Sequence, residues 1–261
     1  LRICSWEEYI DEGDWDEEDA IELSEDKVII GENSMVEDFE EWYYETYGEK
    51  IRVEYSTVGT NEDLYNQMTL GDTFDLVCPS EYMIMKLIAE DELVPFSEEF
   101  YNKDAEHNYY AKGVSPYIEE VLSDLNIDGK ILADYAAGYM WGTLGIVYNP
   151  EEIPEEEATT WELFLNKDYA KRITIKDSVR DSFFGALCIH YQDRLLDEGF
   201  IGSLEYREEI NRILNDTTPE TVEEIENILT KMKENVYSFE TDSGKADLIT
   251  GKVIANMQWS G

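Results

Sequence analysis

The sequence FDLVCPSEY, residues 74–82, combines a short apolar run with a helix start and decides the fold class. Its first five residues have the length and apolarity of a strand buried in a parallel sheet. Pro79 ends this run, and Ser80 stands at the N-cap of a helix that we expect to extend to about Glu90. A strand followed directly by a helix is the repeating unit of an α/β domain. The sequence therefore predicts an α/β fold with a parallel sheet.

The same pattern of strand and helix occurs on the N-terminal side of this stretch. Residues 1–6 predict a short strand. Ser34 and Glu37 have the spacing of a capping box, and the aromatic residues behind them recur at helical spacing, which predicts a helix with one buried aromatic face. Residues 51–55 then alternate as a strand does, and Asn61 starts a second amphipathic helix.

The middle of the chain contains a turn motif and a long apolar segment. Residues 124–129 match the first half of a calcium loop, but Tyr135 stands where that loop requires a bidentate Glu. We therefore predict a tight turn at Asp128-Gly129 instead. Residues 133–149 are mostly apolar and suit a strand that crosses between two lobes.

Strands and helices also alternate in the C-terminal part of the chain. The expected elements are a helix from Thr160, a strand over 172–176, a helix over about 178–191, a helix from Pro219 and a strand over 253–259. We predict two α/β lobes, 1–143 and 144–261, with an acidic insertion at about 11–33 in the first lobe. Because no closing element follows the last strand, we also expect the chain to be cut inside a domain.

The composition favours a folded, acidic protein with cationic partners. The 261 residues are 43% hydrophobic, which is too apolar for a disordered chain. The chain has 61 Asp and Glu against 20 Lys and Arg, and its net charge of -41 repels DNA, other nucleic acids and anionic lipid surfaces. The same charge attracts cations, although an acidic surface also serves solubility alone.

The sequence contains no motif typical of catalysis, metal binding or cofactor binding. Cys4, Cys78 and Cys188 lie far apart in apolar segments and are expected to be free thiols. His107 and His190 lack the spacing of a metalloenzyme, and there is no Gly-rich phosphate loop or Ser nucleophile elbow. We therefore expect no enzyme, no cofactor and no metal site.

Aromatic and acidic residues follow four of the predicted strands. These motifs are residues 6–9, residues 80–82, residues 177–181 and Trp259. Ligands of open α/β sheets bind at the carboxyl ends of strands, and aromatic faces combined with carboxylates select ammonium groups. The alternative is that Trp6 and Tyr9 pack in a core, Ser80 only caps its helix and the acids are solvated.

Seven segments resemble, in the same order, segments of the spermidine/putrescine-binding proteins of bacterial ABC transporters. The segments are SWEEY (5–9), YSTVGTNE (55–62), FDLVCPSEY (74–82), ELVP (92–95), YMWG (139–142), TWEL (160–163) and MQWSG (257–261). FDLVCPSEY and SWEEY are the most specific of them. The resemblance implies a two-lobed, periplasmic-binding-protein-like (type II) fold that is incomplete at the C-terminus and holds a polyamine between its lobes.

The resemblance also implies which residues contact the ligand. They are Trp6, Glu8, Tyr9, Ser80 and Tyr82 in the first lobe and Ser178, Asp181, Thr241 and Trp259 in the second. Ser178 departs from the family pattern, which carries an acid at this position. The lost charge makes a shorter diamine or another amine an alternative to spermidine.

The function implied by the resemblance is that of an extracytoplasmic solute receptor without catalysis. Such a receptor captures putrescine or spermidine by closing its lobes about residues 139–145 and delivers it to an ABC permease. It resides in the periplasm or at the outer face of the cell membrane, tethered or fused to the permease. Because such proteins continue past the position of Gly261, we expect the chain alone to bind polyamines weakly or not at all.

Two other functions remain open at this level. Within the same class, the alternative is a receptor for a sugar, a metal complex or thiamine, although the acids at the predicted site disfavour neutral ligands. In another class, the alternative is a carbohydrate-active enzyme that uses two of the many carboxylates. With 61 acids, a pair at catalytic spacing arises by chance, so the sequence gives this enzyme no specific support.

Overall fold

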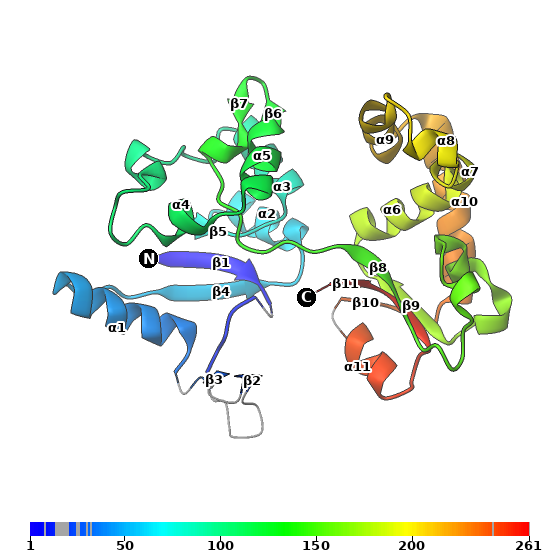
Figure 1. The fold of residues 1–261 in the computed structure, drawn as a ribbon, viewed down its shortest axis with the longest axis horizontal. Coiled ribbons are helices and arrows are strands. Elements are labelled where there is room, and N and C mark those ends of the chain that lie inside the picture. Colours follow the sequence, from blue (N-terminus) through cyan, green and yellow to red (C-terminus); the bar gives the residue numbers. More distant parts are fainter. Residues whose placement is uncertain are drawn as a thin grey trace. The chain divides into compact units, whose positions relative to one another are not determined.

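A computed structural model describes residues 1–7, 9–13, 21–24, 27–29, 31, 33–241 and 243–260 of the chain (Figure 1). The chain forms two compact units, Leu1–Trp141 and Gly142–Gly261. Each unit contains its own sheet of mostly parallel strands together with its own helices. No helix among the described residues is both long enough and apolar enough to cross a membrane.

The first unit is built on a parallel sheet of three strands in the order β4-β1-β5. The strands are β1 (Arg2–Trp6), β4 (Glu54–Val58) and β5 (Leu76–Val77). Ile3 pairs with both Tyr55 and Leu76, so the carboxyl ends of the three strands meet at one edge of the sheet. The prediction of an α/β fold with a parallel sheet is confirmed in this unit.

The position of strand β4 differs from the prediction. Strand pairing with β1 begins where Arg2 faces Glu54, although the Leu1 amino group also donates a hydrogen bond to the Arg52 carbonyl oxygen at 2.8 Å. The predicted strand over 51–55 is therefore wrong in its start, because alternation alone does not show where the partner strand begins. Strand β5 is shorter than the predicted run, although Asp75 and Cys78 both donate backbone hydrogen bonds to β1.

Helix α1 (Met35–Tyr47) begins with the predicted capping box. The Ser34 hydroxyl accepts a hydrogen bond from the Glu37 N–H at 3.2 Å, and the Ser34 N–H donates to the Glu37 carboxylate at 2.9 Å. The predicted buried aromatic face is wrong, since no residue of α1 is buried. Trp42 contacts the His107 ring edge-on, and this contact covers only part of the aromatic face.

The first unit contains further short helices and two antiparallel hairpins. The helices are α2 (Asn61–Thr69), α3 (Glu81–Ala89), α4 (Tyr109–Gly113), α5 (Pro116–Asp124), η1 (Glu98–Tyr101) and η2 (Leu132–Asp134). The hairpins pair β2 (Ile21–Ser24) with β3 (Lys27–Ile29) and β6 (Asn126–Ile127) with β7 (Lys130–Ile131). Asp128 (φ 53°) and Gly129 (φ 82°) both adopt the left-handed backbone of a type I′ turn, so the predicted tight turn is confirmed.

The second unit is built on a sheet of four strands in the order β10-β9-β11-β8. The strands are β8 (Leu144–Tyr148), β9 (Ile173–Lys176), β10 (Ser238–Glu240) and β11 (Ala255–Trp259). Strand β9 is parallel to β10 and β11, whereas β8 is antiparallel to β11. The carboxyl ends of β9, β10 and β11 therefore lie at one edge of the sheet.

Two long helices of the second unit, α6 (Val179–His190) and α10 (Pro219–Asn235), pack against each other (Figure 1). Both agree with the predicted positions. The shorter helices are α7 (Gln192–Leu195), α8 (Glu198–Ile201), α9 (Tyr206–Leu214), α11 (Gly244–Ile249), η3 (Glu155–Glu157), η4 (Trp161–Leu165) and η5 (Lys167–Tyr169). The helix expected from Thr160 is the short 3-10 helix η4.

The hydrophobic cores of the two units differ in size. In the second unit, one continuous cluster of buried side chains joins the sheet to α6 and α10. Its members include Phe164, Ile173, Ile175, Leu187, Ile225, Met232 and Met257. In the described part of the first unit, the buried hydrophobic clusters are two small, separate ones, and Met83, Leu87 and Ala111 are buried outside them. One contains Cys4, Val58 and Leu64, and the other contains Ile88, Leu132 and Ala136.

Candidate ligand-binding site

The first half-site is a group of side chains at and near the carboxyl ends of β1, β4 and β5. Its members are Trp6, Tyr9, Asn61, Ser80, Tyr82 and Tyr139. The ring centroids of Trp6 and Tyr9 are 6.3 Å apart, and those of Tyr9 and Tyr139 are 6.4 Å apart. These rings are half-buried or exposed, so the alternative in which Trp6 and Tyr9 pack in a core is wrong. Glu8, which was predicted to join them, lies outside the described residues.

Tyr139 is tied to the loop after β1. Its hydroxyl donates a hydrogen bond to the Tyr9 carbonyl oxygen at 2.5 Å. Burial is the main cause that raises the pKa of the Tyr139 hydroxyl, so the hydroxyl stays protonated and remains a donor near neutral pH. The hydrogen bond and the ring contact together hold Tyr139 beside the loop, although half of its surface remains exposed.

Asn61 links Ser80 to Tyr82. Its side chain is almost fully buried, and its amide nitrogen donates to the Ser80 hydroxyl at 3.1 Å and to the Tyr82 hydroxyl at 2.8 Å. The Asn61 side-chain carbonyl accepts the Ser80 N–H at 3.0 Å. The Tyr82 hydroxyl in turn donates to the Glu62 carboxylate at 3.3 Å. Because Asn61 starts α2, this network joins the segments that follow β4 and β5.

Ser80 has a different role from the expected one. It occupies the N-cap position of α3, but its side chain makes no hydrogen bond that caps the helix. The hydroxyl bonds to Asn61 instead. The Ser80 hydroxyl therefore does not cap the helix, and its contact with a ligand stays a prediction.

The second half-site is formed at the carboxyl ends of β9, β10 and β11. Its members are Lys176, Ser178, Asp181, Glu240, Thr241 and Trp259. The Trp259 indole N–H donates a hydrogen bond to the Asp181 carboxylate at 3.1 Å. Ser178 caps α6, because its hydroxyl accepts the Asp181 N–H at 3.2 Å. Three of the predicted ligand residues of the second lobe thus lie together.

The Asp181 carboxylate is partly removed from water. This burial raises the pKa of Asp181, while hydrogen bonds from Trp259 and Ser178 and the charges of Lys176 and Arg180 act in the opposite direction. The Trp259 side chain is 44% exposed. A partly desolvated carboxylate gains strongly from a cation, and an exposed indole adds a cation–π contact. The pair is therefore chemically suited to bind an ammonium group.

Lys176 and Glu240 form a buried ion pair next to Thr241. They are partners in the register of β9 and β10, and the Lys176 Nζ lies 3.2 Å from the Glu240 Oε1. Their side chains are only 4% and 3% exposed. The Lys176 ammonium also donates to the Thr241 carbonyl oxygen. The backbone of Thr241 is thereby held at the strand end, while the residue as a whole is exposed.

Sequence reasoning missed four residues of the two half-sites. They are Asn61, Tyr139, Lys176 and Glu240. Asn61 and Tyr139 lie in segments that carry the family resemblance, so their place in the site could have been inferred from it. Lys176 ends a predicted strand and was equally visible. Glu240 ends β10, a strand that the sequence did not predict, and no pattern pointed to it.

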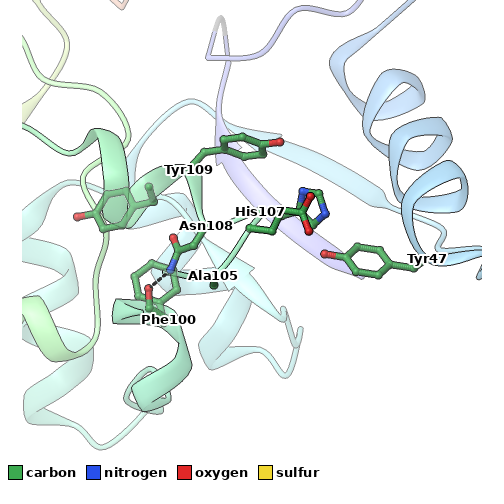
Figure 2. Close-up of a pocket in the computed structure, with 8 residues that line it drawn as sticks. Tyr47, Phe100, Ala105, His107, Asn108 and Tyr109 are labelled. Carbon is green, nitrogen blue, oxygen red and sulfur yellow. Dashed lines mark hydrogen bonds between the residues drawn. The ribbon is translucent and has the colours of Figure 1, made fainter. Parts of the chain in front are cut away.

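One cavity of the first unit is lined by residues outside the first half-site. Figure 2 shows this cavity of about 550 Å³, whose lining includes Tyr47, His107 and Tyr109. Two of its lining residues are joined by a hydrogen bond of 2.6 Å from the Asn108 side-chain amide to the Phe100 carbonyl oxygen. Within the described residues, no cluster of three or more His, Cys, Asp or Glu side chains could hold a metal ion.

Comparison with known proteins gives matches to bacterial solute-binding proteins. A family model described as bacterial extracellular solute-binding protein matches residues 34–261. The spermidine/putrescine-binding periplasmic protein of Salmonella typhimurium is 26% identical over 217 residues, which cover 81% of this chain and 52% of that protein. The putrescine-binding periplasmic protein PotF of Escherichia coli is 25% identical over 222 residues, with the same two coverages of 81% and 52%.

A solved structure extends the comparison to the fold. The substrate-binding protein of the spermidine/putrescine ABC transporter of Streptococcus pneumoniae superposes with a TM-score of 0.59 at 24% identity. The match covers 100% of this chain and 62% of that protein. The expected periplasmic-binding-protein-like α/β fold is confirmed. The chain spans about half the length of the curated relatives it matches.

These matches confirm the resemblance carried by the seven sequence segments. The family model covers the chain from the start of α1 onward, which includes all of the second half-site. The matched family is one of binding proteins, which confirms the expectation that the chain is not an enzyme. The chain belongs to the bacterial extracellular solute-binding protein family.

Proposed function

We propose that the chain is the ligand-binding part of a receptor that captures a polyamine, putrescine or spermidine, and delivers it to an ABC permease. The observation that carries this proposal is the hydrogen bond between Trp259 and Asp181. It holds a partly buried carboxylate beside an exposed indole, and these two groups together recognise ammonium. The first half-site supplies further aromatic rings and hydroxyl groups of the same type.

The contacts expected for a polyamine follow from its chemistry. One ammonium donates to Asp181 and lies against the face of Trp259, while the methylene groups pack on the other aromatic rings. A charge-assisted hydrogen bond contributes about 1.5–3 kcal/mol and a cation–π contact about 0.5–2 kcal/mol. Closure of the two lobes about residues 139–145 would then exclude water from these contacts. Binding and closure are the whole mechanism, without a chemical step.

Charge and relatedness also support a polyamine ligand. The net charge of -41 attracts polyvalent cations over long distances, and this attraction weakens with salt. The printed names of the relatives include spermidine/putrescine-binding and putrescine-binding periplasmic proteins. We place the receptor in the periplasm or at the outer face of the cell membrane, tethered or fused to its permease.

The proposal is tested by calorimetric titration of the longest natural form of the protein that contains these 261 residues. Asp181→Asn should weaken the binding of putrescine or spermidine by about 1.5–3 kcal/mol, because it removes the charge of the ammonium contact. Glu223→Gln on the exposed side of α10 is the matched control and should change binding little.

Two results would contradict the proposal. Equal losses in Asp181→Asn and Glu223→Gln would show that net charge alone attracts the amines. If the protein binds a sugar or thiamine tightly and binds neither putrescine nor spermidine, it is a receptor for that ligand and the polyamine proposal is wrong. The same titration of the 261-residue chain by itself should show weak binding or none, since it covers 62% of the matched pneumococcal receptor.

A further inference from the structure

The second half-site contains a positive charge of its own. The Lys176 side chain lies at the carboxyl end of β9, the edge that also carries Asp181. Its ammonium is almost completely buried, bonded to the Thr241 carbonyl oxygen and 3.2 Å from Glu240. A ligand ammonium that enters this half-site therefore meets a fixed ammonium of the protein.

The ion pair is held in place from three sides. The register of β9 and β10 sets Lys176 opposite Glu240. The second carboxylate oxygen of Glu240 accepts the N–H of Gly244, the first residue of α11, at 2.8 Å. The Asn256 amide donates to the Gly244 carbonyl oxygen at 2.5 Å, which ties this helix start to β11. These contacts fix Glu240, and Lys176 is held in turn by its ion pair with Glu240 and its hydrogen bond to the Thr241 carbonyl oxygen.

The free energy of folding alone does not favour the charges of this pair. Burying two charges costs more than burying apolar side chains of the same size, and replacing such a pair with apolar or neutral groups is often neutral or stabilising. Thr174, on the same face of β9 as Lys176, is fully buried without any charge. A role in ligand selection explains why the charge stands at this edge.

The pair also changes the number of carboxylates available to the ligand. Glu240 is neutralised by Lys176, and Ser178 carries no charge. Asp181 is then the one partly buried carboxylate among the described residues of this half-site that is not paired with a buried cation. The Lys176 charge is close enough to Asp181 to act on its ionisation. A second ligand ammonium at this edge would meet the Lys176 charge, and among the described residues the carboxylate left to offset it is that of Asp177, which is exposed and therefore contributes little.

We propose that Lys176 is a specificity-determining residue that limits the second half-site to one ligand ammonium, so that the receptor prefers a diamine such as putrescine to a triamine such as spermidine. This inference rests on the proposed function. It adds to the proposed polyamine binding a reason for selectivity between putrescine and spermidine, namely the positive charge of Lys176.

The test compares putrescine and spermidine by calorimetry on the same natural form of the protein. The double variant K176M/E240Q removes both charges of the pair and leaves neutral side chains of similar size. The wild-type protein should bind putrescine more tightly than spermidine. In the double variant the ratio of the two affinities should move towards spermidine by about tenfold or more, the effect of one charged contact. K176R, which keeps the positive charge, should retain the wild-type ratio.

A second variant covers the case in which K176M/E240Q does not fold, as judged by its thermal transition. K176Q/E240Q also removes both charges but keeps a hydrogen-bonding group at each position, and it should likewise move the ratio towards spermidine. An unchanged ratio in the folded K176M/E240Q variant, or in K176Q/E240Q if the first variant is unfolded, overturns the inference while the proposed function stands. Wild-type protein that binds neither amine overturns the proposed function, and the inference falls with it.

Discussion

The two units hold comparable half-sites on very different cores. The second unit joins its four strands, α6 and α10 through one continuous hydrophobic cluster, and even its buried ion pair is braced on several sides. The first unit has two small clusters, and none of the residues of α1 is buried. The comparison shows that aromatic and polar side chains can gather at the carboxyl ends of strands in a unit that has only a small hydrophobic core. Hydrogen bonds between residues distant in sequence hold the side chains of both half-sites, and only the second half-site is joined to a large continuous core.

The largest expected difference concerns matched aromatic truncations. Phe164→Ala in the second unit should lower the free energy of unfolding by about 3–5 kcal/mol, because this fully buried ring lies in the continuous core. Phe39→Ala on α1 should cost only about 1 kcal/mol, since this ring is half-buried. Urea denaturation of the two variants measures both values. Equal losses would show that the aromatic face of α1 is covered in solution.

The next effect tests whether hydrogen bonds hold the first half-site. Asn61→Ala removes the group that joins Ser80 to Tyr82 and should cost about 1–3 kcal/mol of stability, because it leaves buried polar groups without their partner. It should also weaken polyamine binding by loosening both side chains. Asn66→Ala, at an exposed position on the same helix, is the matched control for urea denaturation and calorimetry. A loss in the control as large as in Asn61→Ala would point to the helix rather than to the network.

The smallest expected effect is a dependence on pH within the second unit. The Asp216 carboxylate accepts hydrogen bonds from the Tyr191 hydroxyl, the Thr218 N–H and the Thr221 hydroxyl, with distances of 3.0 Å and 2.9 Å to the two threonines. These bonds, with Tyr191 first, hold the pKa of Asp216 well below its usual range. A carboxyl group with a lowered folded pKa adds stability above its unfolded pKa of about 3.9 and loses it as the pH falls further.

Asp216→Asn should therefore be less stable than the wild type near neutral pH. The difference in free energy of unfolding between the two proteins should become smaller as the pH falls below about 4. Urea midpoints measured between neutral pH and the acid limit of folding give this profile. Glu37 in the first unit is the counterpart, since the bonds from Ser34 lower its pKa as well. Because Glu37 is exposed, Glu37→Gln should change the profile less. A gap that stays constant over the whole range would contradict the role of the Asp216 carboxylate.

Polyamine affinity should also depend on pH, through the protonation of Asp181. Burial raises the pKa of Asp181, so this carboxylate takes up a proton at a higher pH than an exposed Asp does. The amines keep their charge in this range, and polyamine affinity should therefore fall as Asp181 becomes protonated. In Asp181→Asn this part of the pH dependence should be absent from the calorimetric profile.

Much of the local structure could be predicted from the sequence, since it depends on neighbours along the chain. The capping box at Ser34, the turn at Asp128-Gly129 and the start of α10 at Pro219 all appear in the structure where the sequence places them. The start of β4 could not be predicted in the same way. It is set by its pairing with Arg2 in β1, which no periodicity shows. The prediction that the aromatic face of α1 is buried was wrong for a similar reason. Periodicity shows which side chains share one face of a helix, but it does not show whether another element packs against that face.

For the site, the sequence by itself determined which residue types follow which strands, and only together with the family resemblance did this predict an amine receptor. Only the tertiary structure decided that Trp259 bonds to Asp181, that Asn61 rather than the α3 helix end holds the Ser80 hydroxyl, and that Lys176 faces Glu240. The physical reason is that each contact joins residues distant in sequence. Such contacts depend on strand register and on the packing of helices against the sheet, and a local sequence pattern specifies neither of them.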